Sequence, residues 1–171
     1  MTAIVKADEN DSHLLSKLAT LTFIESHGHS AKSEDINHYA AEKYNADILK
    51  EELLDRKNIF HIIYHNNQAA GYSKIILNFP YHNSQTCNIT KLERLYLLKE
   101  FYNLKLGLKL FKFIIDLIKK DDQNVIWLFV WKENQRAIDF YKKNGFVIIG
   151  SHDFKISETH SNPNHQMFLK L

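Results

Sequence analysis

Glycine is scarce in this chain, with five glycines in 171 residues, about 3% where ~7% is usual. Gly28, Gly71, Gly107, Gly145 and Gly150 form neither a G-x-G-x-x-G motif nor a G-x-x-x-x-G-K-S/T motif. Both motifs need closely spaced glycines because backbone amides must approach phosphate oxygens. The sequence therefore excludes these two nucleotide-binding fingerprints, and any phosphate-binding loop here contains at most one glycine.

Cysteine, excess charge of one sign and long apolar runs are also scarce or absent. The lone Cys87 cannot form an internal disulfide, which suits a reducing cytoplasm. The 22 lysines and arginines nearly balance the 20 aspartates and glutamates, which gives little support for nucleic-acid binding. The longest apolar run, residues 125–131, is far shorter than the ~20 residues that span a bilayer, and the first residues include acids where a signal peptide would be apolar. We therefore expect a cytoplasmic protein without a nucleic-acid or membrane partner.

Histidine is abundant by contrast, with ten residues. They fall into loose groups such as His27 with His29, and none of these groups has the ligand spacing of a zinc site. We expect scattered surface histidines and no metal.

The length and the apolar periodicity indicate one α/β domain over residues 1–171, because no linker or repeat divides the chain. The patterns predict strands over 2–7, 59–64, 70–77, 91–98, 125–131, 146–150 and 166–171, and a loop over 78–88. They predict helices after residues 8–11, over about 33–55, over 105–120 and over 133–144. A hairpin followed by two strand–helix–strand crossovers indicates one central mixed sheet.

Residues 92–110 run from a strand through a short loop into an amphipathic helix. A helix N-terminus has unpaired amides and the positive end of the helix dipole, and Lys105 and Lys109 would add positive charge. A phosphate site is one interpretation, and an ordinary strand–helix junction is the other.

Residues 131–146 contain the pattern N-x-x-A-I-x-F-Y-x-x-x-G-F, formed by Asn134, Ala137, Ile138, Phe140, Tyr141, Gly145 and Phe146. This pattern resembles the second cofactor motif of the GNAT N-acetyltransferase family. The run L-E-R-L-Y-L-L-K-E-F over 92–101, with its following loop and helix, resembles the main cofactor motif of that family. The segments T-F-I-E-S-H over 22–27 and G-S-H-D-F over 150–154, with Met167, are similar to a PaiA-like branch.

The resemblance covers nearly the whole chain and implies a fold, a co-substrate and an assembly. The implied fold is a central mixed, mostly antiparallel sheet of about seven strands, with helices on both faces and a splayed parallel strand pair. The implied co-substrate is acetyl-CoA, and the implied partners are an amine substrate and, as in many similar proteins, a second copy of the chain.

The resemblance also implies cofactor-binding residues. The pantetheine arm would pair with the backbone of Leu95, Tyr96 and Leu97, and the pyrophosphate would lie on Tyr102, Asn103, Leu104, Lys105, Leu106, Gly107 and Leu108. The family pattern for this loop is Q/R-x-x-G-x-G/A, whereas Tyr102 replaces the Gln or Arg and Lys105 replaces the first glycine. A lysine there either crowds the pyrophosphate or offers its ammonium as a point charge, so we expect weakened but not abolished cofactor binding.

Catalytic roles follow from the same resemblance. Tyr141 would protonate the leaving thiolate as a general acid, although it could also be a core aromatic residue. Asn134 would contact the pantetheine or cap a helix. Glu93 is a candidate general base, which strict strand alternation places on the face of Leu95 and Leu97 and opposite Arg94. A structural ion pair or a contact with a charged substrate would equally explain Glu93, because an acid in an apolar strand is either paired or has a raised pKa.

The substrate surface is expected on the first helix and the segment after it, at Phe23, His27, His29, Tyr39 and Tyr44, although core packing also explains the aromatic residues. These assignments predict an N-acetyltransferase that transfers an acetyl group from acetyl-CoA to a primary amine of a polyamine, small amine or protein. The amine would attack directly, through a tetrahedral intermediate, and the Leu97 N–H would polarise the thioester carbonyl. The alternative is a non-catalytic GNAT-fold binding or regulatory protein with weakened CoA binding.

Overall fold

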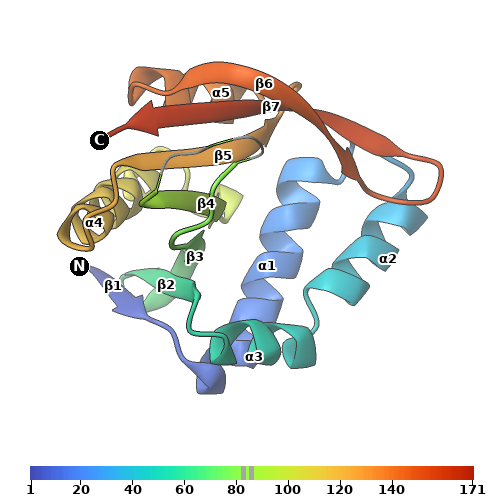
Figure 1. Ribbon diagram of the computed structural model, residues 1–171. Coiled ribbons are helices and arrows are strands. Elements are labelled where there is room, and N and C mark those ends of the chain that lie inside the picture. Colours follow the sequence, from blue (N-terminus) through green and yellow to red (C-terminus); the bar gives the residue numbers. More distant parts are fainter. Residues whose placement is uncertain (82–83, 85–86) are drawn as a thin grey trace.

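In the computed structural model, which describes residues 1–81, 84 and 87–171, seven strands form one sheet (Figure 1). The strands are β1 (Thr2–Lys6), β2 (Asn58–His65), β3 (Gln68–Ile76), β4 (Ile89–Leu97), β5 (Val125–Trp131), β6 (Val147–Lys155) and β7 (Ser161–Lys170), in the order β1-β2-β3-β4-β5-β7-β6. Among the described strands, β4 and β5 are the only parallel neighbours. The expected mixed, mostly antiparallel sheet is therefore confirmed. The expected loop over 78–88 includes residues 82–83 and 85–86, which lie outside the described residues.

Helices cover both faces of this sheet. They are α1 (Ser12–His27), α2 (Ser33–Lys43), α3 (Ala46–Leu54), α4 (Leu106–Lys120) and α5 (Gln135–Lys143), with short 3₁₀ turns at Glu9–Asp11 and Lys99–Phe101. Helices α1, α2 and α3 bury residues such as Leu15, Ile36 and Leu49 in one core, whereas α4 and α5 bury Leu110 and Ile138 in another. The sheet therefore separates two apolar cores.

The single helix expected over 33–55 is wrong, because the chain forms α2 and α3 with a break at Tyr44 and Asn45. The Asn45 side chain accepts a hydrogen bond from the Ile48 amide at 3.0 Å, which makes Asn45 the N-cap of α3. Tyr44 is only 5% exposed and packs between the helices and β4. The break therefore brings an aromatic side chain to the sheet.

The last two strands are longer than the alternation of apolar residues predicts. β6 and β7 pair from Val147 with Phe168 to Lys155 with Ser161, although their turn-proximal halves are mostly polar. Backbone hydrogen bonds between the two strands extend the ladder where few apolar side chains mark it. The first of the two strands therefore ends at Lys155 rather than at the expected residue 150, and the second begins at Ser161 rather than at the expected residue 166.

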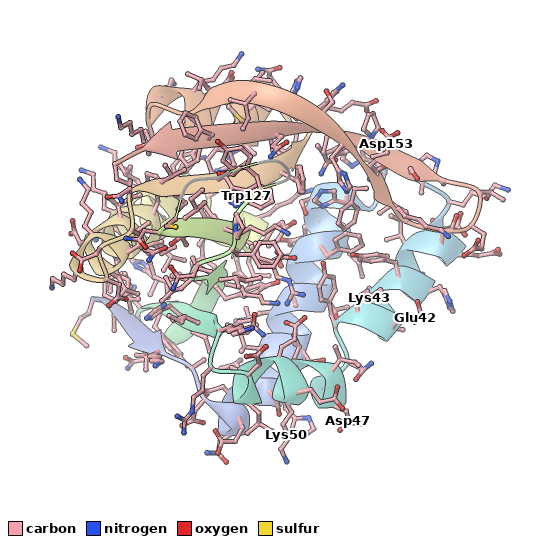
Figure 2. All side chains as sticks on the ribbon, viewed as in Figure 1. Glu42, Lys43, Asp47, Lys50, Trp127 and Asp153 are labelled. Atoms are coloured by element: carbon pink, nitrogen blue, oxygen red, sulfur yellow. The ribbon has the colours of Figure 1, made fainter. Side chains whose placement is uncertain are left out.

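Burial follows the layers of the fold. Trp127 lies inside the molecule, whereas Glu42, Lys43, Asp47 and Lys50 extend outward from α2 and α3 (Figure 2). Within the described residues, no helix is both long and apolar enough to cross a membrane.

Candidate active site

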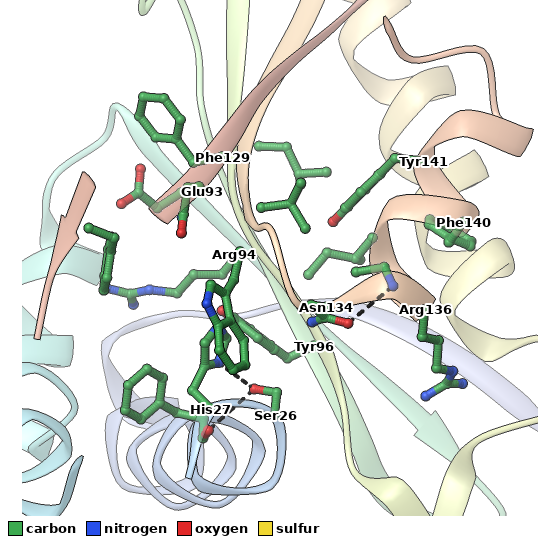
Figure 3. A pocket seen from close by; sticks show the side chains of 18 of the residues that line it. Ser26, His27, Glu93, Arg94, Tyr96, Phe129, Asn134, Arg136, Phe140 and Tyr141 are labelled. Atoms are coloured by element: carbon green, nitrogen blue, oxygen red, sulfur yellow. Dashed lines mark hydrogen bonds between the residues drawn. The ribbon is translucent and has the colours of Figure 1, made fainter. Parts of the chain in front are cut away.

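The two parallel strands β4 and β5 separate after a short paired segment. Only Ile89–Lys91 of β4 pair with Val125–Trp127 of β5, although β4 continues to Leu97 and β5 to Trp131. A cavity of about 250 Å³ occupies this gap, and its lining includes residues from helices on both faces of the sheet (Figure 3). The splayed pair expected from the family resemblance is therefore present, and it forms the cavity.

A β-bulge at Glu93 shapes the wall of the cavity. Ile75 of β3 pairs with Leu92, and the neighbouring Lys74 pairs with Arg94, so Glu93 has no partner in this register. A bulge interrupts the alternation of side chains between the two faces. Leu95 and Leu97 pack against the core of α4 and α5, whereas Arg94 contacts Glu52 of α3 on the opposite face. Glu93 interacts electrostatically with Arg94 and with Tyr39 of α2, so it lies on the Arg94 side. The expectation that Glu93 shares the face of Leu95 and Leu97, opposite Arg94, is therefore wrong.

Backbone amides of β4 point into the gap. Leu98 N donates to Ala70 O of β3 at 2.9 Å, and amide direction alternates along a strand. The amide of Tyr96 therefore points toward β3, while those of Leu95 and Leu97 point toward the side from which β5 has separated. Two of the three predicted backbone contacts thus offer hydrogen bonds to a molecule in the cavity.

The predicted pyrophosphate loop leads into the N-terminus of α4. Tyr102 and Gly107 line the cavity. The remaining predicted residues, Asn103, Leu104, Lys105, Leu106 and Leu108, are not part of its lining. Lys105 is exposed and has a φ of 58°, the left-handed region in which a residue with a Cβ is strained by roughly 1–2 kcal/mol. Leu106 is 1% exposed and belongs to the core.

Arg136, which the sequence reasoning missed, lies beside this loop. Its guanidinium carbon is 3.3 Å from the ring centroid of Tyr102, and both residues line the cavity. The contact joins the first turn of α5 to the loop before α4, so no local sequence pattern could indicate it.

Tyr141 and Asn134 are held by α5 on the same side of the sheet. The Asn134 side chain accepts a hydrogen bond from the Ala137 amide at 3.1 Å and is the N-cap of α5, yet it also lines the cavity. Tyr141 is 8% exposed, and burial raises its pKa above the ordinary value. Its hydroxyl therefore keeps its proton near neutral pH and can act as a donor.

Glu93 is ion-paired. Its Oε2 lies 2.7 Å from Lys91 Nζ. Burial raises the pKa of Glu93, but Lys91, Lys74 and Arg94 outweigh burial and hold the pKa below the usual value. Of the two states expected for this carboxylate, it therefore adopts the paired one, which makes it a weaker base than a free carboxylate.

Arg94 and Lys74 share another carboxylate beneath the cavity. Arg94 donates from Nη1 and Nη2 to the two oxygens of Glu52, at 2.8 and 3.0 Å, and Lys74 Nζ lies 3.2 Å from Glu52 Oε2. The Arg94 guanidinium also lies 5.1 Å from the Tyr44 ring centroid. Glu52 lies 42 residues before Arg94, so sequence reasoning had no signal for this pairing.

Aromatic side chains line the other side of the cavity, toward α1 and α2. Phe23, His27, Tyr39 and Tyr44, all predicted, are in the lining. The predicted His29 is not, but its ring lies 5.1 Å from that of Trp131. The sequence reasoning missed Phe129, Trp131, Phe154, Asn162 and Asn164, which complete this wall.

His27 is neutral in this wall. Burial, with a smaller effect of His29, lowers its pKa to about 4. Its Nδ1 lies 2.7 Å from Ser26 Oγ, which also lies 2.7 Å from Thr22 O, so the Ser26 hydroxyl links the His27 ring to the backbone of α1. Among the described residues, no three His, Cys, Asp or Glu side chains come close enough together to hold a metal ion.

Comparison with known proteins identifies the same family that the two cofactor motifs resemble. The model of the Acetyltransferase (GNAT) family matches residues 18–146. An uncharacterized N-acetyltransferase in the pepI 3′ region of Lactobacillus delbrueckii subsp. lactis is 27% identical over 155 residues, which cover 91% of this chain and 90% of that protein.

Solved structures share the fold. PaiA N-acetyltransferase from Thermoplasma acidophilum, solved with coenzyme A, has a TM-score of 0.82 at 21% identity and covers 100% of this chain and 99% of its own. A GNAT-family acetyltransferase from Staphylococcus aureus has a TM-score of 0.73 at 19% identity, with 100% and 99% coverage. The chain therefore belongs to the GNAT acetyltransferase family, as an acyltransferase that uses acetyl-CoA as its co-substrate.

Proposed function

We propose that this enzyme transfers the acetyl group of acetyl-CoA directly to a primary amine that enters from the α1–α2 side. The supporting observation is a single cavity that passes between β4 and β5 and has Tyr141 on one side and an aromatic wall on the other. Such a cavity lets two substrates meet in the gap between the strands.

The cofactor half of the cavity offers fitting partners for a thioester with a phosphorylated tail. The Leu95 and Leu97 amides can pair with an amide-bearing arm, and the free amides at the N-terminus of α4 suit phosphate oxygens. Tyr102 replaces the Gln or Arg of the family pattern in this loop, and the guanidinium of Arg136 on α5, which stacks on the Tyr102 ring, supplies a cation there. Within the loop, the Lys105 side chain is exposed and does not line the cavity, so its ammonium can approach phosphate without filling the cavity.

In the reaction, the amine nitrogen forms a bond to the acetyl carbon to give a tetrahedral intermediate, and collapse of this intermediate then breaks the carbon–sulfur bond. The Leu97 N–H would stabilise negative charge on the carbonyl oxygen. The Tyr141 hydroxyl would donate its proton to the departing thiolate. Glu93 stays the candidate acceptor for the amine proton, through Oε1, the oxygen that Lys91 does not use.

The test is release of free thiol from acetyl-CoA across a panel of primary amines, combined with calorimetric binding of acetyl-CoA. Tyr141→Phe should lower kcat by about 100-fold or more, within the usual range for a lost general acid, and should change acetyl-CoA affinity less than twofold. Tyr64→Phe, on β2 and outside the cavity, is the matched control and should behave as wild type.

Equal turnover of Tyr141→Phe and wild type would remove Tyr141 from the mechanism. Binding of acetyl-CoA without thiol release for any amine would instead match a non-catalytic binding protein. The cytoplasmic location expected from Cys87, the single domain over 1–171 and the homodimer expected from the family resemblance stay predictions.

A further inference from the structure

At the end of the cavity toward α1 and α2, where the amine would enter, the charges of the ionised side chains do not sum to zero. Lys91, Glu93 and Arg94 line the cavity, and Glu52 and Lys74 contact Arg94 or each other behind it. Three cations therefore face two carboxylates, which leaves one positive charge in excess. The remaining charged residue of the lining, Arg136, lies at the cofactor end beside Tyr102, and His27 is neutral.

Because the side chains that carry this excess charge are largely buried, the charge acts strongly on a molecule bound in the cavity. The side chains of Lys74, Arg94 and Lys91 are 7%, 11% and 16% exposed, and those of Glu52 and Glu93 are 21% and 28% exposed. Solvent and salt screen such charges less than they screen surface charges. A second positive charge brought into this end of the cavity therefore meets net repulsion, whereas a negative charge is attracted.

Arg94 has donors left for an anion. A guanidinium has five N–H groups, and Arg94 gives one Nη1 and one Nη2 hydrogen to Glu52. The Arg94 side chain reaches into the cavity near Glu93 (Figure 3). A substrate carboxylate could accept hydrogen bonds from the remaining N–H groups without breaking the pair with Glu52.

The same charge excess favours the reactive form of the amine. Nucleophilic attack needs the neutral amine, and a site of net positive charge disfavours the ammonium form. Glu93, held by Lys91, is a weak base. Binding of the amine in its neutral form therefore reduces the work that a general base must do.

We propose, on the basis of the transferase function above, that the acceptor is a primary amine carrying a carboxylate on an aromatic body, as in an aromatic amino acid, with that carboxylate bound at Arg94 and Lys91. Phe23, Tyr39, Phe129 and Trp131 provide a wall on which an aromatic ring can pack. A polyamine brings two or more positive charges into the same space and is a poor acceptor.

Matched amines that differ only in the carboxylate test this inference. Tyrosine and phenylalanine should be acetylated with kcat/KM at least tenfold higher than tyramine and phenethylamine, and spermidine should be slower still. Raising the salt concentration should raise KM for tyrosine more than for tyramine, because a charge attraction is screened. Faster acetylation of tyramine or spermidine than of tyrosine would overturn the inference.

Single-lysine variants test whether Lys91 causes the preference for a carboxylate-bearing amine. Lys91→Gln should reduce the preference for tyrosine over tyramine about tenfold, whereas Lys112→Gln, an exposed lysine on α4 outside the cavity, removes the same charge and should leave the preference unchanged. Equal preferences in the two variants would exclude Lys91 as a carboxylate partner.

A binding measurement separates this inference from the proposed function. Calorimetric titration of the CoA complex with N-acetyltyrosine and N-acetyltyramine needs no turnover, and the carboxylate-bearing product should bind at least tenfold more tightly. Tighter binding of N-acetyltyrosine without turnover of any amine would support the acceptor class while refuting the catalytic function. Equal affinities for the two products would refute the acceptor class whatever the turnover.

Discussion

Replacement of Gly71 by alanine should disturb catalysis from a position outside the cavity. Gly71 lies on β3 opposite Leu97, the residue whose amide we place at the reacting carbonyl. A Cβ at residue 71 would lie against the Tyr96 carbonyl oxygen, 2.5 Å from Leu97 Cδ2 and 2.9 Å from Leu97 Cα, where ordinary contact begins at 3.4 Å. Because backbone atoms of β4 are involved, side-chain rotation cannot relieve the overlap.

The size of the effect follows from the shift that β4 must make. The overlap requires a movement of roughly 0.5–1 Å at Tyr96 and Leu97, and overpacking of this kind costs about 1–3 kcal/mol of unfolding free energy. Misplacement of a catalytic group by about 1 Å can lower the rate on the order of 100-fold. We therefore expect Gly71→Ala to lower kcat by about 10- to 100-fold while the protein remains folded.

Gly150→Ala is the matched control, because its Cβ would contact only the Gln166 side chain, with the flexible Oε1 end at 3.2 Å and Cβ at an ordinary 3.8 Å. The assays are thiol release at saturating acetyl-CoA and urea unfolding of both variants. Gly150→Ala should stay within twofold of wild type in kcat and within about 0.5 kcal/mol in stability. Wild-type kcat in Gly71→Ala would refute the assignment of the Leu97 amide to the reaction.

Two further predictions concern the loop before α4 and pH. At Lys105, glycine should be more stable than alanine by about 1 kcal/mol in urea unfolding, because the φ of 58° strains a residue with a Cβ. Both variants should bind CoA more weakly than wild type by a similar factor if the Lys105 ammonium contacts phosphate, and unchanged CoA affinity would exclude that contact. At His27, the folded pKa of about 4 lies below the unfolded value of 6.5, so between these values the unfolded chain binds a proton that the folded chain does not, and stability falls as pH falls. The loss of unfolding free energy from pH 7 to pH 5 should be about 2 kcal/mol smaller in His27→Gln than in wild type, and an equal loss in both would contradict the buried neutral state of His27.

Much of the fold could be predicted because its strongest local signals agree with the tertiary structure. The apolar run over 125–131 coincides with β5. The amphipathic helix expected over 105–120 corresponds to α4, which begins one residue later, at Leu106. Prediction was less successful where local signals are weak. The turn at Asn45 lies inside a helical pattern, and the extension of β6 depends on backbone pairing with β7 rather than on apolar side chains.

The site was predictable where a short motif carries it and not where distant segments meet. Asn134 and Tyr141 lie on one helix at motif spacing, so a resemblance could identify both. Arg136 lies between them in the same helix, but its stacking partner Tyr102 belongs to another loop. Only the folded chain brings these two side chains together.

The sequence by itself determined the order of the seven strands and of the helices apart from the division into α2 and α3, the exclusion of multi-glycine phosphate loops, and the family to which the chain is similar, because these depend on neighbouring residues. The tertiary structure decided the chemistry of the cavity. The bulge at Glu93 arises from pairing with β3, so it turns Glu93 and Arg94 to the same cavity against the alternation of an isolated strand. Glu93 pairs with Lys91, whereas Arg94 and Lys74 share the single carboxylate of Glu52, and this leaves the excess positive charge that an amine meets. Burial determines how strongly each of these charges acts.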